Sequence, residues 1–221
     1  MVKSFLKKLA SSSADNSLAA SLRRKRFQHF LKIVEQFDGK PITILDVGGW
    51  ERFWEIQGFA DTSNYIILLN TEKFETRHSR ISSVVGDARK MDEFRDQSID
   101  VVFSNSVIEH LESYDNQLKM ANEVRRVGKK YFIQTPSYSF PLEPHFLFPF
   151  FHRFPVCFRI FLVQHLSLGH YKRLEDKEAA EKLVREHRLL SKREFQSLFP
   201  DASIFTERFL GFVKSYIAVK W

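Results

Sequence analysis

The chain has 221 residues, 43% of them hydrophobic, which suits a single folded domain with a sizeable core. Cys157 is the one cysteine, so a disulfide framework within the chain is excluded and the cytoplasm is the expected setting. The formal net charge of +7 favours anionic partners without identifying one, because such an excess is equally typical of an ordinary solvated surface.

The N-terminal part of the chain begins with a basic segment, residues 1–24. Its apolar run is too short for a signal peptide, and Phe5 and Leu6 among lysines could form a weak anchor at a membrane interface. A helix is expected next, because apolar side chains recur at helical spacing and would form one buried stripe: Phe27, Phe30, Leu31, Val34 and Phe37.

The middle of the chain alternates short apolar runs with looped or helical connections. The runs are residues 42–47, 64–70, 81–88, 98–106 and 129–136. Residues 114–128 read as a helix ended by a glycine, and the closing runs 203–212 and 213–221 read as a hairpin. This pattern predicts an α/β protein with a Rossmann-like, doubly wound, mostly parallel seven-stranded sheet and an antiparallel C-terminal hairpin.

The last third of the chain departs from this alternation. Residues 140–170 are rich in aromatics, and helices are expected at 174–189 and 191–199, the latter with Ser191 as cap and Glu194 three residues on. Prolines and charges interrupt 140–163, so no transmembrane helix is expected. Three interpretations stay open for this stretch: a lid, a hydrophobic acceptor pocket, or a face resting on a membrane surface.

The first strand ends in a candidate ligand site, "ITILDVGGWERFWE" at residues 42–55. Open parallel sheets bind ligands outside the carboxyl ends of their strands, and glycines there let the backbone approach a ligand. The G-x-G-x-x-G spacing of dinucleotide sites is absent. An acid at the strand tip suits a ligand with positive charge, and S-adenosylmethionine carries an ammonium and a sulfonium.

These residues resemble a motif of a known protein family. "ILDVGG" (44–49) resembles the first motif of class I S-adenosylmethionine-dependent methyltransferases. Later motifs follow in the family's order at "VVGDARKM" (84–91), "SIDVVFSNSVIEHL" (98–111) and "EVRRVGKKYFIQTPS" (123–137), and residues 189–218 resemble small bacterial, type-11-like members. The resemblance predicts a single methyltransferase domain over 25–221, with an aromatic-rich insertion at 140–170.

The resemblance implies S-adenosyl-L-methionine as cofactor and a set of residues that would bind it. These are Asp46, Gly48, Gly49, Asn70, Asp87, Ala88, Ser104, Asn105 and Ser106. Asp46, Asp87 and Asn70 could equally be turn or loop residues, and 104–106 a polar cap. The sequence departs from the family where Trp50 and Arg52 replace glycines and Asn70 replaces an acid, although an amide can still donate and accept hydrogen bonds.

Methyl transfer to a hydroxyl needs an aligned acceptor and benefits from a base. His110 follows the fourth strand, and Glu143 and His145 follow the fifth, so these three are the candidate catalytic residues. Each has an ordinary structural alternative: a cap at a helix start, or part of a stiff lid. No zinc-like spacing is recognised, so no metal is expected.

The expected function is methyl transfer to a small-molecule, sugar or lipid-linked acceptor, at oxygen. The alternative is a non-catalytic protein that binds the cofactor or a partner. Nucleic acid is not expected, because no RNA-binding appendage or base-methylation signature is present. The protein is expected in the cytoplasm, with peripheral contact at the inner membrane surface through 140–163 as an open alternative; the sequence leaves the oligomeric state unspecified.

Overall fold

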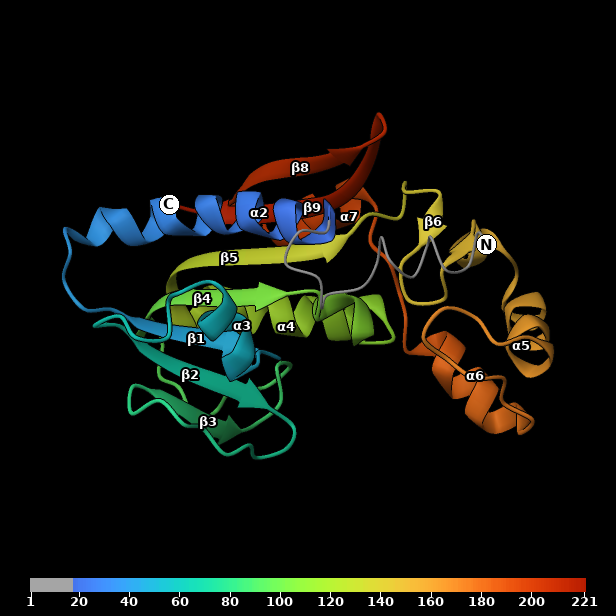
Figure 1. The fold of residues 1–221 in the computed structure, drawn as a ribbon, viewed down its shortest axis with the longest axis horizontal. Coiled ribbons are helices and arrows are strands. Elements are labelled where there is room, and N and C mark those ends of the chain that lie inside the picture. Colours follow the sequence, from blue (N-terminus) through green and yellow to red (C-terminus); the bar gives the residue numbers. More distant parts are fainter. Residues whose placement is uncertain (1–17) are drawn as a thin grey trace.

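The structure is a computed structural model that describes residues 18–221, with side chains from residue 24 (Figure 1). The proposed interfacial anchor of residues 3–8 lies outside the described residues. A seven-stranded sheet in the order β3-β2-β1-β4-β5-β9-β8 forms the centre. Its strands are β1 (Thr43–Val47), β2 (Tyr65–Asn70), β3 (Ile81–Val85), β4 (Ile99–Asn105), β5 (Gly128–Pro136), β8 (Ser203–Phe209) and β9 (Phe212–Lys220).

The strand order and directions confirm the predicted fold class. β1 to β5 are parallel, β9 is antiparallel to β5, and β8 pairs antiparallel with β9 as the predicted hairpin. The chain runs outward from β1 through β2 to β3, and then starts again with β4 on the other side of β1. The order therefore reverses between β1 and β4, which is where such sheets bind ligands.

One face of the sheet is covered by α2 (Leu18–Val34), by the short η1 (Glu35–Phe37) that follows it in the chain, and by α3 (Glu51–Ile56). Phe27 and Phe30 of the predicted stripe are buried here, while Leu31, Val34 and Phe37 pack at its margin. Trp54 of α3 is fully buried among aromatic rings from α2 and β4. Aromatic packing thus fixes α3, and with it the loop after β1, on the sheet.

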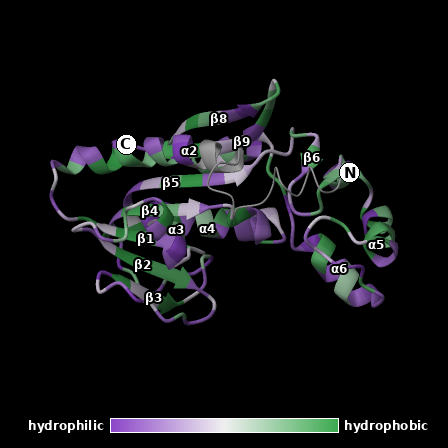
Figure 2. Cartoon of the chain, viewed as in Figure 1, coloured by the Kyte–Doolittle hydropathy of each residue, from purple (hydrophilic) through white to green (hydrophobic). Residues whose placement is uncertain are grey.

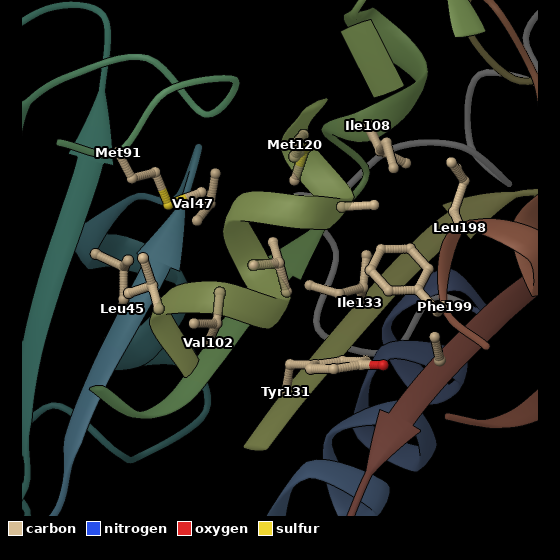
Figure 3. Close-up of a cluster of buried hydrophobic side chains, with 14 of the residues drawn as sticks. Leu45, Val47, Met91, Val102, Ile108, Met120, Tyr131, Ile133, Leu198 and Phe199 are labelled. Atoms are coloured by element: carbon tan, nitrogen blue, oxygen red, sulfur yellow. The ribbon is translucent and has the colours of Figure 1, made fainter. Parts of the chain in front are cut away.

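The other face is covered by α4 (Tyr114–Val127) and α7 (Lys192–Leu198). Met120 of α4 and Leu198 of α7 belong to the same buried cluster as Val102 and Ile133 of the sheet (Figure 3). Ser191 and Glu194 form the predicted capping box at the start of α7. Gly128 ends α4 and begins β5 at once, so the connection between the two is tight.

A third group of elements lies beyond the carboxyl ends of the parallel strands (Figure 1). It comprises η2 (Ile108–His110), β6 (Leu142–Glu143), β7 (Phe148–Pro149), η3 (Phe151–Arg153), α5 (Val156–His165) and α6 (Lys177–Arg185). α5 and α6 pack on each other around their own apolar cluster, in which the rings of Phe146 and Phe151 stack at 4.1 Å. β1 and β2 of the sheet are largely hydrophobic, whereas α5 and α6 mix both kinds of residue (Figure 2).

The helix predicted at 174–189 is shorter in the structure, because local hydrogen bonds set its ends. Asp176 caps its start by accepting a hydrogen bond from the Ala179 amide at 2.7 Å. The helix ends at Arg185, which leaves His187 in the following segment. Among residues 18–221, no helix combines the length and apolar character needed to cross a membrane.

Candidate functional site

The loop after β1 is built on two glycines that no other residue could replace without rearrangement. Gly48 has φ +74°, and a Cβ on it would lie 2.6 Å from a methyl group of Val107. A Cβ on Gly49 would lie 1.7 Å from the Asp46 carboxylate. The loop therefore passes directly over the buried side chain of Asp46. The backbone of Gly48 and Gly49 can then lie close to the ends of the strands.

Asp46 is buried beneath this loop, with only 2% of its surface exposed. Its Oδ2 accepts a hydrogen bond from Nε1 of Trp54 at 2.8 Å. Burial raises the pKa of Asp46 to about 7, partly opposed by the Trp54 hydrogen bond. The structure thus places Asp46 as a support of the loop that faces α3. Its direct contact with a cofactor stays a prediction.

A cleft of about 320 Å³ opens beside the loop, at the carboxyl ends of β1, β2 and β3. We call it the strand-end cleft; its walls include Gly48, Asn70, Asp87, Ala88, Val107, His110, Leu111 and Glu112. Asn70 donates from Nδ2 to the Gly49 carbonyl at 2.9 Å, so its amide oxygen stays available as an acceptor. A glycine-floored cleft with such an amide, a carboxylate and apolar walls suits a nucleoside.

Asp87 lies partly exposed at the rim of this cleft and is held by Arg89. Its carboxylate accepts hydrogen bonds from the Arg89 amide at 2.8 Å and from the guanidinium at 2.6–3.0 Å. The side-chain hydrogen bond from Arg89 lowers the pKa of Asp87. A ligand that contacts Asp87 must therefore share it with Arg89.

Trp50 and Arg52 lie outside the strand-end cleft. The Trp50 ring is 58% exposed and packs on Phe74 with ring centroids 4.5 Å apart. Both residues line a separate hollow of about 280 Å³ on the outer side of the loop. The indole of Trp50, which replaces a glycine of the family's first motif, therefore leaves the cleft open.

Ser104, Asn105 and Ser106 make internal hydrogen bonds rather than lining the cleft. Ser104 donates to the Val47 carbonyl at 3.1 Å, and Ser106 donates to Gln134 at 2.9 Å. Asn105 accepts from Arg26 of α2, which also contacts Gln134 and Glu207. These residues tie α2 across the ends of β4 and β5, and their contact with a cofactor stays a prediction.

Three histidines from distant parts of the chain meet at one end of the cleft. His110 lies in η2, His145 follows β6, and His187 follows α6. Their ring centroids are 4.8, 4.8 and 4.3 Å apart, for His110–His145, His110–His187 and His145–His187. We call this group the histidine cluster. It brings together the predicted His110 and His145, while His187 was not predicted.

Comparisons with known proteins identify a similar domain and similar folds. Residues 55–131 match the family model of the methyltransferase domain. A solved S-adenosylmethionine-dependent methyltransferase from Methanosarcina mazei aligns with a TM-score of 0.52 and 11% identity, covering 81% of this chain and 91% of that chain. One from Aquifex aeolicus gives a TM-score of 0.48 at 15% identity over 99% of this chain and 98% of that chain.

Residues 55–131 of the chain thus resemble a methyltransferase domain. This match supports the predicted family and its S-adenosyl-L-methionine cofactor, and the Methanosarcina structure shares the predicted fold. Two uncharacterized proteins of Mycobacterium tuberculosis are 33% identical over 67 residues, covering 30% of this chain and 23% of each relative. The match thus spans less than a quarter of the curated relatives' length.

Hydrogen bonds orient two of the clustered imidazoles. His145 donates from Nδ1 to Glu143 at 2.7 Å, and His187 donates from Nδ1 to the Leu183 carbonyl at 2.9 Å. Burial opposes charge on His145, but its hydrogen bond to Glu143 and the charges of Glu143 and Glu109 outweigh this and raise the pKa of His145. Glu143 also accepts the amides of His145 and Phe146, so it shapes this turn.

The other charges of the cluster are set mainly by burial. Desolvation and the two neighbouring imidazoles lower the pKa of His110 to about 3, although part of the residue is exposed. Desolvation also lowers the pKa of His187 and raises the pKa of the fully buried Glu109 to about 7. Glu109 accepts from Thr135 at 3.1 Å through Oε2, and its Oε1 has no partner among the described residues.

A second cavity, of about 580 Å³, adjoins the histidine cluster on the side of the insertion. Glu112 lines both this insertion cavity and the strand-end cleft, and His187 lines the insertion cavity as His110 lines the cleft. Arg159 of α5 also lines it, and its Nε is buried with no hydrogen-bond partner in residues 24–221. Sequence patterns gave no signal for His187 or Glu112, because only tertiary packing brings them here.

Asp46 gives the domain a pH-dependent stability. Because the folded pKa lies near 7 and above the ordinary 3.8, the folded state binds the proton more tightly than the unfolded state. The free energy of unfolding is therefore expected to fall as the pH rises from about 4 to 7. Asp46→Asn, which keeps an oxygen for Trp54, should remove up to roughly 4 kcal/mol of this fall.

Urea denaturation of both proteins at several pH values in this window measures the difference. Asp92→Asn, at an exposed acid, is the matched control and should follow the parent protein. An equal decline in the Asp46 variant and the parent would contradict the assignment.

Proposed function

We propose that this chain transfers a methyl group from S-adenosylmethionine to an oxygen of a small-molecule, sugar or lipid-linked acceptor. The observation that carries the proposal is that Glu112 lines both cavities, and that the histidine cluster has one member in the wall of each. Methyl transfer requires two binding spaces that share one point, because the acceptor atom must be aligned with the departing group. The strand-end cleft would take the cofactor, and the insertion cavity would take the acceptor.

The residues of the strand-end cleft fit the cofactor. When bound there, S-adenosylmethionine supplies an electrophilic methyl group. The free amide oxygen of Asn70 can accept a hydrogen bond from a ribose hydroxyl, as the acid at this position would in the family. Val107 and Leu111 offer apolar contact, and Gly48 lets the backbone approach closely.

The acceptor oxygen would be activated by the histidine cluster. His110, His145 and Glu143 are the residues proposed to act there, with Glu143 orienting the imidazole of His145 through Nδ1. An oriented imidazole is the usual group that handles a proton near neutral pH, which favours a hydroxyl acceptor over a carbon.

The insertion cavity also favours an acceptor with an anionic group. A guanidinium nitrogen that is buried without a partner is costly, and the Nε of Arg159 is such an atom. A phosphate or carboxylate on the acceptor would supply the missing partner. The net charge of +7 is consistent with attraction of such a ligand.

The first test is cofactor binding by isothermal titration with S-adenosylmethionine. Gly48→Ala should weaken binding at least 10-fold, because the new methyl group meets Val107 and the backbone is strained at φ +74°. Trp50→Leu, outside the cleft, is the control and should bind like the parent. No binding by the parent at millimolar ligand would contradict the proposal. Binding without turnover across acceptor extracts would favour the non-catalytic alternative.

The second test concerns the charge of the acceptor. Transfer from labelled S-adenosylmethionine is measured on hydroxyl compounds in matched neutral, phosphorylated and carboxylated forms. Arg159→Met should raise KM for the anionic forms about 10-fold or more, as expected for the loss of a charged hydrogen bond. The neutral forms should change little, and Arg173→Met, at an exposed arginine, should change neither. An equal effect on neutral and anionic acceptors would contradict the anionic subsite.

A lipid-linked acceptor would agree with a membrane-facing surface on the insertion. Phe150, Phe158 and Phe161 are exposed, and Arg153 lies over the Phe150 ring at 5.2 Å. Exposed aromatics beside cations are typical of proteins that rest on a bilayer. We therefore propose peripheral contact of this face with anionic membranes.

Sedimentation with vesicles containing anionic lipid tests this contact. The parent protein should sediment with the vesicles, and the double variant Phe158→Ser, Phe161→Ser should lose most of that binding. Leu118→Ser, at an exposed position on α4, is the control. Failure of the parent to bind, or equal binding by the double variant, would contradict the proposed contact.

A further inference from the structure

The histidine cluster has the composition and spacing of a metal site. The ring nitrogens of His110, His145 and His187 that could bind an ion all lie within 4.8 Å of one another. Three nitrogen ligands around a tetrahedral zinc ion stand about 3.4 Å apart, given Zn–N distances of about 2.0–2.1 Å. Modest side-chain rotations would therefore close the group around one ion.

In two of the three histidines, Nδ1 is held by an oxygen, which makes Nε2 the nitrogen that faces a possible ion. His145 and His187 each use Nδ1 to donate to an oxygen, of Glu143 and Leu183 respectively. In the neutral rings the lone pair is then on Nε2. A carboxylate or a carbonyl on the other ring nitrogen is the usual arrangement behind a metal-bound histidine, because it fixes the tautomer and the ring direction.

A second, independent observation points to a missing positive charge. Glu109 is fully buried next to His110 in the chain, interacts electrostatically with His145, and has an unpartnered Oε1. A buried carboxylate oxygen without a partner is rare in native proteins and calls for an explanation such as an ion. A divalent cation between the imidazoles would lie close to this carboxylate and compensate its charge.

We propose that His110, His145 and His187 bind one divalent transition-metal ion, with zinc as the ion that this donor set suits best. Three histidines leave a fourth position open, as in catalytic zinc sites. The expectation of no metal rested on the linear spacing of the candidate ligands, whereas this proposal rests on the positions of the three histidines in the fold. The hydroxyl of Tyr171, 3.0 Å from Nε2 of His187, would give up that hydrogen bond when the ion binds.

The position of the site gives the ion a role. His110 lines the strand-end cleft and His187 lines the insertion cavity, so the open position lies where the two adjoin. An oxygen bound to such an ion loses its proton more readily, because the metal charge stabilises the anion. Binding of the ion is independent of methyl transfer, whereas this role in preparing an acceptor hydroxyl rests on the proposed function.

The experiment is a Co²⁺ titration of the full, tag-free chain, followed by the visible absorption of tetrahedral cobalt, with Zn²⁺ competition to measure affinity. One equivalent should bind with intense visible bands and be displaced by Zn²⁺. His110→Ala changes a partly exposed ligand and should lower the affinity at least 100-fold. Glu143→Gln, behind His145, should lower it about 10- to 100-fold. His165→Ala, at an exposed histidine of α5, is the matched control.

Loss in the His110 variant with no loss in the His165 variant supports the site. Absence of the bands in the parent, or equal affinity of the His110 variant and the parent, overturns it. Circular dichroism verifies that each variant is folded. Titration with S-adenosylmethionine in parallel separates the two proposals: the ion bound without the cofactor leaves the metal site standing and rejects methyl transfer, and the reverse result rejects only the metal site.

Discussion

The site depends on one contact, the passage of the Gly48–Gly49 loop over the buried carboxylate of Asp46. That carboxylate occupies the space where a side chain at position 49 would lie, and Val107 occupies the space beside position 48. Only glycines, which have no side chain, can cross here. The loop therefore lies close to the strand ends and leaves a cleft above them. The cost of burying Asp46 is offset in part by the Trp54 indole, which is itself locked by aromatic packing. Removing that packing would therefore change the cleft from a distance, through α3.

The same contact shows that Asp46, the acid of the first motif, has a structural role. Viewed along the sequence, Asp46 is a charge at a strand tip that awaits a cation. In the fold it faces inward, and burial moves its pKa toward neutrality. There it sets the path of the loop, while its direct contact with a cofactor stays a prediction. Asn70 contributes to the same end, since its amide hydrogen bond to Gly49 holds the loop from the neighbouring strand. Trp50 can replace a glycine because that loop turns its ring outward onto Phe74.

Sequence reasoning recovered the parts of this protein that are set locally or by the sheet. Hydrophobic runs gave the strands, Ser191 and Glu194 gave the start of α7, and the motif order gave the family. It did not find the partners of 104–106, because Arg26 reaches them from a helix far away in the sequence. It found two histidines of the cluster through their places after strands, and missed His187 because a histidine after a helix carries no local signal. The fold alone joins positions 110, 145 and 187.

The segment after β5 determines where several polar residues of the candidate site lie. A class I sheet provides a cofactor cleft from short loops at its strand ends, but a pocket for a second molecule needs additional chain. Here the segment after β5 folds around its own apolar cluster, so it can carry polar groups on the side that faces the cleft without losing its packing. This segment supplies His145 to the histidine cluster and Arg159 to the insertion cavity, and the return of the chain toward α7 adds His187. In the proposed function, acceptor choice would therefore reside in this segment, and changes there would alter the substrate while the strand-end cleft stays intact.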